Sequence, residues 1–417
     1  MSVANADDIR PSLWLLRYVW CFIVVGVVLT FRPSLPAFAQ LASFSHVFDV
    51  NSGYAIPDRL TRRSYYVARN GRDWNDGSAD HPWATLTHAG AVTMAGDTIH
   101  VAAGTYNENV VTERGGKASS RITYISDVRW GAKITGTGPR DVWDVNVSYV
   151  DVIGFDLSGD GCTGLFFWGN YNRAIGNNVH NAAPYPACSR GGAGLDDSTS
   201  FQGNQFIGNF VHDVGISDPL CGTPGHKGVH GIYQTEQNAK VLNNISVNNC
   251  GFGIHMWPIS QNSVVVNNTI VNNRSGGILV SSDKTVVYNV SIRNNIVVDN
   301  GTGTTGAGIA ISVNPTATLG TNVFCSNNLI FRNKGRDSNF SSPVCTNCIK
   351  GEDPLFMNNT GDAAGDYHLR SRSPAIGKGT SQDAPVIDID GGARRIGQTP
   401  DIGAYEFGSP AAAWPWH

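Results

Sequence analysis

Short runs of alternating apolar and polar residues recur along the middle of this chain, and each run begins with glycine. In Gly253-Ile254-His255-Met256, Ile254 and Met256 point to one face of a strand while His255 points to the other. The spacings between successive runs fall as low as 22 and 24 residues, which we take as one bare repeat. This pattern predicts an all-β parallel solenoid of stacked short strands. The runs begin at Gly164, Gly194, Gly231, Gly253, Gly277 and Gly308.

A second set of strands alternates with the first, and each of these begins with asparagine. Asparagine tolerates the left-handed conformation of a tight turn, and its side-chain amide can bond the asparagines above and below it. We therefore expect an asparagine ladder in phase with the glycine-led column. Longer repeats must loop outward, and the excess lies between residues 164 and 231, where we expect function. The strand-leading residues are Asn177, Asn209, Asn244, Asn268, Asn295 and Asn328.

The N-terminus reads as an export signal. Arg10 and Arg17 precede an apolar run over residues 18–31, and Ala37-Phe38-Ala39 supplies a small-x-small cleavage site. We expect a signal peptide over 1–39, an uncleaved signal anchor being the alternative, and hence a secreted or periplasmic monomer that meets the membrane only through this signal. We further expect a leader over 40–63, an N-terminal cap with a short helix over 64–110, coils over 111–335, C-terminal coils and a cap over 336–407, and a disordered tail over 408–417.

Composition excludes one class of partner and raises a question about cysteine pairing. The 417-residue chain carries a net charge of -3 with a pI of about 6.4, so it has no basic surface for nucleic acid. Seven cysteines follow the signal, an odd number that leaves at least one thiol free or bridged to another chain. Cys188 and Cys221 lie in the two longest excursions and are placed to staple them. Cys325 is placed to pair with Cys345 or Cys348. Cys345-Thr346-Asn347-Cys348 is half of a zinc motif without a second pair, so we do not expect zinc.

Both ends of the predicted solenoid resemble a known group. YYVARNGRDWNDGSADHPWATLTHAGAVTMAGDTIHVAAGTYNE at residues 65–108, the stretch at 353–369, SPAIGKG at 373–379 and DIGAYEF at 401–407 are similar to segments of secreted right-handed parallel β-helix proteins. These belong to the pectate-lyase-like superfamily, which includes polysaccharide lyases of the family 9 type. The resemblance covers about residues 64 to 407. It implies a right-handed parallel β-helix, and it leaves the chemistry open among lyases, hydrolases, epimerases and binders.

The glycine-led column exposes one outward register, formed by the residue two positions after each glycine. Its middle members are Asp196, Tyr233 and His255, and coils about 4.8 Å apart would stack these side chains in one groove. Trp168 and Trp257 flank the groove and suit sugar rings. His180 and His212 occupy matching positions in the asparagine-led strands, where we expect a stacked pair on a different face. Further candidates in the adjoining excursions and strands are Arg190, Asp197, Asp218, His226, Lys227, His230 and Glu236.

These residues suit β-elimination on a uronate-containing polysaccharide, in which a base removes a proton and a cation or hydrogen-bond donor stabilises the resulting charge. The resemblance implies Lys227 as base and Ca²⁺ on Asp196 and Asp197, with Asp218 as a weaker third ligand. The family's four aspartates are not matched at their usual spacing, so a metal-free mechanism through Tyr233, His230 and His255 stays open. Substrate binding falls to the remaining candidates, which are Arg190, Trp168, Trp257, Glu236 and His226.

Three alternatives remain beside the lyase. A glycoside hydrolase needs two carboxyl groups roughly 5 to 9.5 Å apart, and Asp196, Asp197, Asp213 and Glu236 are the candidates. A C5-epimerase begins with the same proton abstraction as a lyase. A non-catalytic carbohydrate-binding surface protein would use the groove only to hold glycan. We expect a secreted polysaccharide lyase.

Overall fold

The computed structural model describes residues 63–184, 186–188, 191–223, 228–282, 285–302, 308–313, 320–334, 338–339, 345–395 and 398–414. All of them belong to one compact unit that spans residues 50–417. The expected signal peptide and all but the last residue of the expected leader lie outside the described residues. Within the described ranges, no helix has the length and apolar character needed to cross a membrane.

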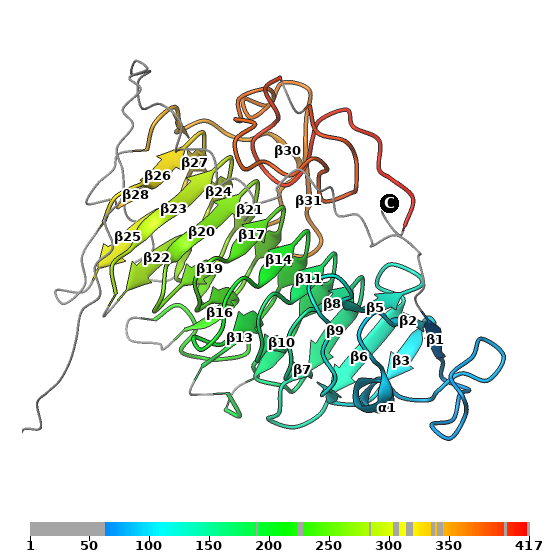
Figure 1. Cartoon of the computed structure of the whole chain (residues 1–417). Coiled ribbons are helices and arrows are strands. Elements are labelled where there is room, and N and C mark those ends of the chain that lie inside the picture. The colour runs from blue at the N-terminus through cyan, green and yellow to red at the C-terminus, as the bar shows by residue number, and fades with distance from the viewer. Residues whose placement is uncertain are drawn as a thin grey trace, which may run out of the picture. The chain divides into compact units, whose positions relative to one another are not determined.

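Three long parallel sheets run side by side, because each coil of the chain adds one strand to each sheet (Figure 1). The first sheet, in spatial order, comprises β1 (Ser64–Val67), β2 (Thr98–Val101), β5 (Ile122–Ser126), β8 (Val150–Ile153), β11 (Arg173–Ile175), β14 (Gln205–Ile207), β17 (Lys240–Leu242), β20 (Gln261–Val266), β23 (Tyr288–Arg293) and β26 (Val323–Ser326).

The second sheet holds the glycine-led strands. It comprises β4 (Val110–Thr112), β7 (Trp143–Val145), β10 (Thr163–Phe167), β13 (Gly192–Asp197), β16 (Val229–Gln234), β19 (Phe252–Met256), β22 (Gly276–Ser282), β25 (Ile309–Val313) and β28 (Ser338–Asn339).

The third sheet holds the asparagine-led strands. It comprises β3 (Gly104–Tyr106), β6 (Ala132–Gly136), β9 (Asp156–Gly159), β12 (Asn178–His180), β15 (Phe210–His212), β18 (Ile245–Val247), β21 (Thr269–Val271), β24 (Ile296–Val298), β27 (Leu329–Phe331) and β29 (Ile349–Lys350). The sequence pattern marked the second and third sheets and did not separate the first.

The apolar side chains of the second sheet fill the interior, as the alternation predicts. Ile254 lies opposite Ile232 and Ile278 in neighbouring coils, and all three are fully buried. Two positions further along the same strands, Met256 and Val280 form the next buried pair. Each coil buries the apolar side of its neighbour, so a single core cluster runs through the stack.

The predicted asparagine ladder is present at the start of the third-sheet strands. The backbone N–H and the Nδ2 of Asn244 both donate to Oδ1 of Asn268, at 2.9 and 3.0 Å. The left-handed conformation belongs to the residue before each ladder asparagine, such as Asn243 with φ 56° and Asn267 with φ 57°. The two asparagines of each pair therefore have different roles. The first adopts the left-handed conformation of the turn, and the side chain of the second forms hydrogen bonds with buried backbone groups. A second ladder, which the pattern search missed, joins Asn249, Asn273, Asn300 and Asn333.

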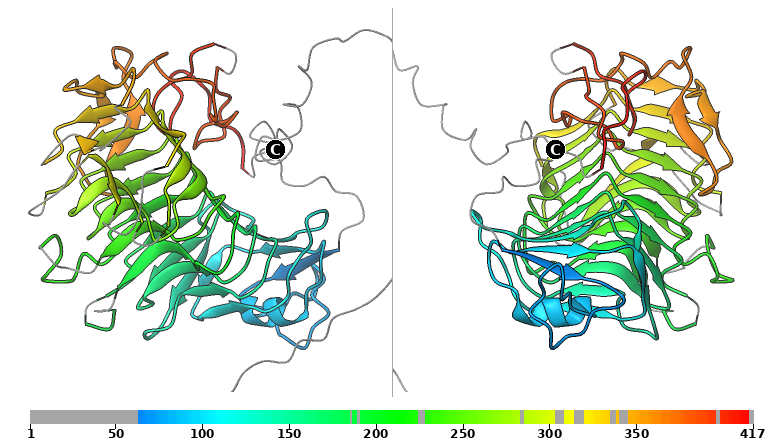
Figure 2. Two further views of the ribbon diagram at one scale, coloured as in Figure 1. Left: turned by 60° about the vertical axis from the view of Figure 1, so that its left-hand side comes forward. Right: turned by 90° about the vertical axis from the view of Figure 1, so that its right-hand side faces the viewer.

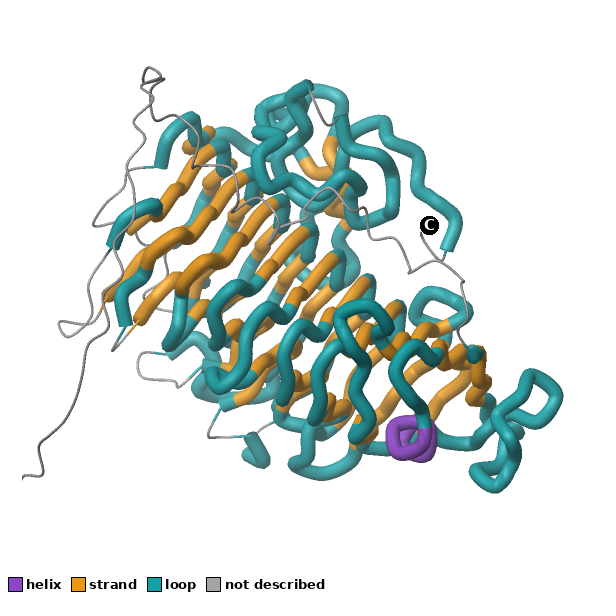
Figure 3. Tube along the Cα trace, viewed as in Figure 1, coloured by secondary structure: helices purple, strands orange, loops and turns teal. Residues whose placement is uncertain are grey.

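A short helix covers the beginning of the solenoid, and it is the one helix among the described residues (Figure 3). It is α1 (Leu86–Val92), which lies within the cap in which a short helix was expected. The hydroxyl of Thr85 caps it by accepting from the backbone N–H of His88. Gly90 lets α1 approach β4, since a Cβ there would lie 2.3 Å from the carbonyl oxygen of Val111.

The C-terminal segment packs against the outside of the third sheet after the hairpin of β30 (Phe356–Asn358) and β31 (Asp366–Leu369) (Figure 2). Phe356, Tyr367 and Ile402 join a cluster with outward residues of that sheet such as Val271. The expected disordered tail is corrected in part. The indole N–H of Trp414 donates to the carbonyl of Ser126 at 2.9 Å, which anchors the chain there.

Two disulfides tie the long excursions to the coils. Cys188 pairs with Cys162, and Cys221 pairs with Cys250. Each of these pairs joins an excursion to the body of the solenoid, so the two excursions are stapled separately and not to each other.

Candidate active site on the second sheet

The predicted outward column is in register. Asp196 lies opposite Tyr233, and Tyr233 lies opposite His255, on the adjacent strands β13, β16 and β19. Phe166 precedes this column on β10, and Leu279 follows it on β22. These side chains line a groove of about 770 Å³ on the second sheet, which we call the second-sheet groove. Along this register the polar column is therefore flanked by the apolar residues Phe166 and Leu279.

Two histidines in the groove form a hydrogen-bonded chain whose direction is set by the backbone. The N–H of Phe252 donates to Nδ1 of His230 at 3.1 Å. A backbone N–H can only donate, so Nδ1 of His230 is the acceptor and its Nε2 carries the proton in the neutral ring. Nε2 of His230 lies 3.0 Å from Nδ1 of His255, and Nε2 of His255 lies 3.2 Å from Oγ of Ser281. Proton donation thus runs from His230 to His255 and on to Ser281.

Burial keeps the distal histidine of this chain neutral. It lowers the pKa of His255 to about 3. At neutral pH, His255 therefore donates one hydrogen bond and accepts another, and it brings no positive charge to the groove.

Aromatic rings cover both ends of the polar column. Trp257 stacks on Tyr233 with ring centroids 6.5 Å apart and an interplanar angle of 11°. Trp168 stacks on Phe166 at 4.4 Å, and its side chain is 45% exposed. Trp257 lines the groove, and Trp168 lies beside the lining residue Phe166. Flat, part-exposed rings beside polar groups can bind sugar faces.

A carboxyl cluster occupies the end of the groove nearest the N-terminus. Burial, and then the charge of Asp197, raise the pKa of Asp196 well above its usual range. Burial, and then the charge of Asp144, raise the pKa of Asp141 to about 7. Burial also raises the pKa of Asp144, which lies opposite Phe166 on β7. These groups resist ionisation because they are desolvated and share one site.

Asp141 and Asp144 were missed by the sequence analysis. Asp144 lies in β7 and Asp141 lies two residues before it. This strand begins with Trp143, so the search for glycine-led runs passed over it. The available signal was the alternation Trp143-Asp144-Val145, which places Asp144 outward between two buried residues.

Two predicted site residues lie inside the coil instead. Asp197 is 1% exposed, and its Oδ1 accepts from the backbone N–H and hydroxyl of Thr235. Glu236 is fully buried, and its carboxylate accepts from the backbone and side chain of Asn204. Burial raises the pKa of Asp197 to about 7, and burial followed by the Asp197 charge raises that of Glu236 to about 10. Contact with substrate does not fit either position.

The predicted Ca²⁺ ligands do not converge. Asp196 faces the groove and Asp197 faces the interior, because consecutive residues of a strand point to opposite sides. Asp218 lies in a turn, where its carboxylate accepts from the N–H of Leu220. A calcium site made of these three residues does not fit this arrangement. Arg190, His226 and Lys227 lie outside the described residues.

The expected second histidine pair is present on the third sheet. Each of its rings contacts a carboxylate, whereas the histidines of the groove bond each other. His180 and His212 stack with parallel rings 4.9 Å apart on the third sheet. His180 contacts Asp156 at 3.0 Å, and His212 contacts Asp213 at 2.7 Å. Asp213, a candidate for a hydrolytic carboxyl, is therefore on a different face of the coil from Asp196.

Comparisons with known proteins agree with this architecture. A family model described as a right-handed β-helix region matches residues 163–360, and a protein family of unknown function (DUF1565) matches residues 69–114. The pectate lyase Pel9A superposes with a TM-score of 0.51 and 16% identity, over 84% of this chain and 97% of Pel9A. The chain is a right-handed parallel β-helix protein.

Other similarities to this β-helix are weaker or shorter. A rhamnogalacturonan lyase superposes with a TM-score of 0.45 and 16% identity, over 70% of this chain and 75% of the lyase. The uncharacterised protein YwoF of Bacillus subtilis (strain 168) is 37% identical over 59 residues, which are 14% of this chain and 13% of YwoF. At 16% identity the likeness to Pel9A establishes the fold alone, and the chemistry must be argued from the groove.

Proposed function

We propose that this β-helix is an enzyme that binds an acidic polysaccharide in the second-sheet groove and cleaves it by β-elimination. The observation that carries the proposal is the juxtaposition of Asp196, Tyr233 and His255 on adjacent strands, in a hollow bordered by aromatic rings. Strands of one sheet lie about 4.8 Å apart, so consecutive side chains of this column reach the same sugar ring.

Asp196 supplies the hydrogen-bond donor that elimination needs. Burial and the neighbouring Asp197 raise the pKa of Asp196 well above its usual range, which favours the protonated carboxyl. A neutral carboxylic acid can donate to the carboxylate of a uronate, and it draws off the charge that develops when the neighbouring carbon loses its proton. This role requires no metal, in keeping with the divergence of Asp196, Asp197 and Asp218.

Tyr233 is the group placed to transfer the proton. Its ring lies 5.2 Å from His255 and 5.1 Å from His230, centroid to centroid. The ring nitrogens of both histidines take part in the hydrogen-bonded chain to Ser281. The two rings are therefore held in place, and they support the phenol ring of Tyr233. In this role the phenolate of Tyr233 takes the proton from the carbon next to the uronate carboxylate, and the resulting phenol returns it to the leaving glycosidic oxygen, so the residue ends the cycle as it began.

A panel of uronate polysaccharides tests this function directly. The purified chain is incubated with each polymer, with Ca²⁺ and with chelator, while ultraviolet absorbance and reducing ends are followed together. We expect both signals to rise on at least one polymer, because elimination leaves an unsaturated sugar. We expect chelator to leave the rate unchanged. No gain in either signal on any polymer contradicts the enzyme and favours a carbohydrate-binding protein.

The variant Asp196→Asn separates the donor role from acid–base chemistry. An asparagine amide still donates, so this variant keeps part of the elimination activity. It also loses the fall in rate that the wild type shows as rising pH ionises Asp196. A complete loss of activity at every pH contradicts a donor role.

Hydrolysis is the second candidate, and the Asp141–Asp144 pair favours it. The pKa of Asp141, about 7, is matched to acid–base work at neutral pH. Asp144 and Asp196 lie two strands apart, a backbone separation of roughly 9.6 Å from two strand spacings. An inverting hydrolase uses carboxyl groups at a comparable separation. Reducing ends that rise without ultraviolet absorbance would identify hydrolysis.

A further inference from the structure

The last member of the first asparagine ladder faces cysteine where every earlier member faces asparagine. Asn295 donates from its backbone and its side chain to Oδ1 of Asn328. In the next coil Ile349 pairs with Leu329, so the residue at the ladder position is Cys348. The backbone N–H of Asn328 donates to Sγ of Cys348 at 3.4 Å. A sulfur atom thus takes the place of the amide oxygen.

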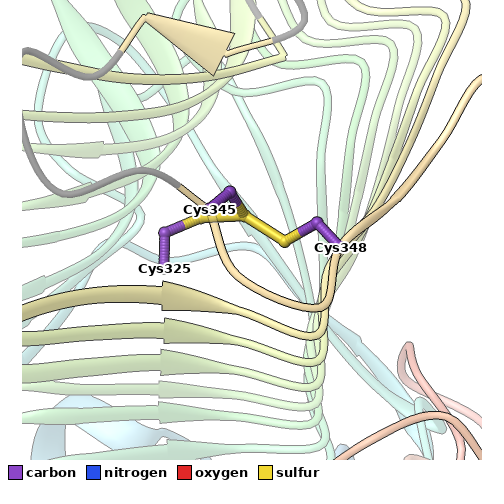
Figure 4. Close-up of side chains that lie close together, drawn as sticks. All are labelled: Cys325, Cys345 and Cys348. Atoms are coloured by element: carbon purple, nitrogen blue, oxygen red, sulfur yellow. A yellow bond between two sulfur atoms is a disulfide. The ribbon is translucent and has the colours of Figure 1, made fainter.

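Two further sulfur atoms converge on the same amide. The Sγ atoms of Cys325, Cys345 and Cys348 all lie within 4.8 Å of one another (Figure 4). Nδ2 of Asn328 lies 3.3, 3.7 and 3.9 Å from these three sulfurs in that order. It also donates to the carbonyl of Ile292 at 2.9 Å. One N–H of the side chain is held by the coil, and the other points into the three-cysteine cluster.

The number of bonds that a sulfur atom can form limits the disulfides of this cluster. Cys345 is placed to bond both Cys325 and Cys348. A sulfur atom forms one disulfide at a time, so an oxidised cluster contains one bridge and one thiol. The two bridges elsewhere, Cys162–Cys188 and Cys221–Cys250, account for the other four cysteines after residue 39. The odd thiol of the chain is thereby assigned to this cluster.

We propose that the three-cysteine cluster is a thiol–disulfide exchange site, in which one bridge alternates between Cys325–Cys345 and Cys345–Cys348. The thiolate of Cys348 attacks Sγ of Cys345, the new bond forms, and Cys325 leaves as the thiolate. The reverse step restores the first bridge. One bond forms and one breaks, so no external oxidant or reductant is consumed. Cys345 is the shared sulfur of both states.

Asn328 stabilises the attacking and leaving groups. N–H donors favour a thiolate over a thiol, and the thiolate is the nucleophile in exchange. The two N–H groups of Asn328 reach Cys348 and Cys325, which are the two sulfurs that alternate as the thiolate. Asn328 is therefore a positioning residue for this site.

Solvent reaches the cluster from one side. Cys325 is 1% exposed and Cys345 is 9% exposed, whereas Cys348 is part-exposed. The state with Cys325 bridged presents its thiol at Cys348, where a small disulfide or an alkylating reagent can react. The other state shelters its thiol at Cys325.

Trapping the thiols tests the proposal. The full chain is quenched in acid, unfolded, alkylated and digested, and labelled and disulfide-linked peptides are identified by mass spectrometry. We expect one label per cluster, divided between Cys325 and Cys348, together with both linked peptides. Cys21 is mapped separately. A single bridge with the label confined to one cysteine overturns the exchange. Three labels together with one equivalent of bound zinc or copper overturn it in favour of a metal site.

Two variants fix the cluster in one state each. Cys348→Ser leaves the Cys325–Cys345 bridge and no thiol in the cluster. Cys325→Ser leaves the Cys345–Cys348 bridge and again no thiol. A label that persists on a cluster cysteine in both variants contradicts a shared bridge.

The role of Asn328 is tested against a matched control. Asn328→Ala should slow alkylation of the cluster thiol in the folded chain about threefold to tenfold, because it removes the Nδ2 donor that reaches Sγ of Cys325 and of Cys348 while the backbone N–H stays. Asn333→Ala removes the last asparagine of the second ladder, whose side chain contacts the carbonyls of Val297 and Phe331. It should cost similar stability and leave the alkylation rate unchanged. Equal slowing by both variants means that Asn328 acts through the fold alone.

Discussion

Two histidine pairs on adjacent coils sit on different faces of this solenoid and have different partners. On the third sheet, His180 and His212 stack on each other, and each contacts a carboxylate. In the second-sheet groove, His230 and His255 bond each other and end on Ser281, with no carboxylate in the chain. Burial lowers the pKa of His255 to about 3, so the groove pair brings a neutral imidazole to its site.

The difference shows that register alone does not make a site. Each pair joins neighbouring coils, but His180 and His212 stack in register, whereas His230 and His255 meet edge-on with an interplanar angle of 77°. The third-sheet pair has its polar groups satisfied by Asp156, Asp213 and Asn178. The groove pair instead adjoins Tyr233, Asp196 and Trp257 in a hollow large enough for sugar. We therefore expect loss of function from changes in the groove, and little from equivalent changes on the third sheet.

The largest expected effect is on catalysis. Tyr233→Phe removes the proton-transferring hydroxyl and keeps the ring that stacks on Trp257, so kcat should fall about 10²- to 10⁴-fold. His212→Asn, on the third sheet, should keep kcat within about twofold. Initial rates on the responsive polysaccharide measure both. Equal losses in the two variants would remove the distinction between the faces.

The next effect falls on the ladder that supports both faces. Asn268→Ala leaves the backbone N–H and Nδ2 of Asn244 without their acceptor, and unfolding should cost about 2 to 4 kcal/mol less. Asn289→Gly removes a member of an exposed asparagine row and keeps the left-handed backbone, so its cost should be below about 1 kcal/mol. Urea unfolding compares the two variants. A larger loss in Asn289→Gly would contradict a stabilising role for the buried ladder.

Acid sensitivity should separate the two pairs. The folded pKa of His255 lies below its usual value of 6.5, so the folded chain binds fewer protons than the unfolded one. The stability that neutral His255 gives to the folded state is fully present above pH 6.5. It is lost as the pH falls toward about 3, by at most about 1.4 kcal/mol per pH unit. His255→Gln should flatten this part of the stability profile. His212→Asn should leave the His255 step in place, and an identical flattening would refute the assignment.

The smallest effect concerns substrate affinity. Trp257→Ala removes a ring beside Tyr233 and should raise KM about threefold to tenfold with a smaller change in kcat. Trp74→Ala is the matched control, because this tryptophan is 79% exposed on the N-terminal cap. A change in kcat alone would assign Trp257 to positioning Tyr233 instead of binding sugar.

The sequence carries the fold and the middle of the groove, and physical reasons limit the rest. Period two and the glycine markers fix which side chains point inward, and so the alignment of Asp196, Tyr233 and His255 could be predicted. Asp144 was not recognised as a groove residue because β7 lacks the glycine that marks the runs of the repeat. Glu236 was misplaced because it binds Asn204 as a ladder asparagine would, and a single carboxylate in a repeat looks like a site residue.

The most direct test of the account is a crystal structure of Tyr233→Phe soaked with an oligosaccharide of the responsive polymer. We predict a sugar ring over the Tyr233 position, one face toward Trp257 and its carboxylate within hydrogen-bond distance of Asp196. Sugar bound on the third sheet beside His180 and His212, with an empty second-sheet groove, would contradict the central claim.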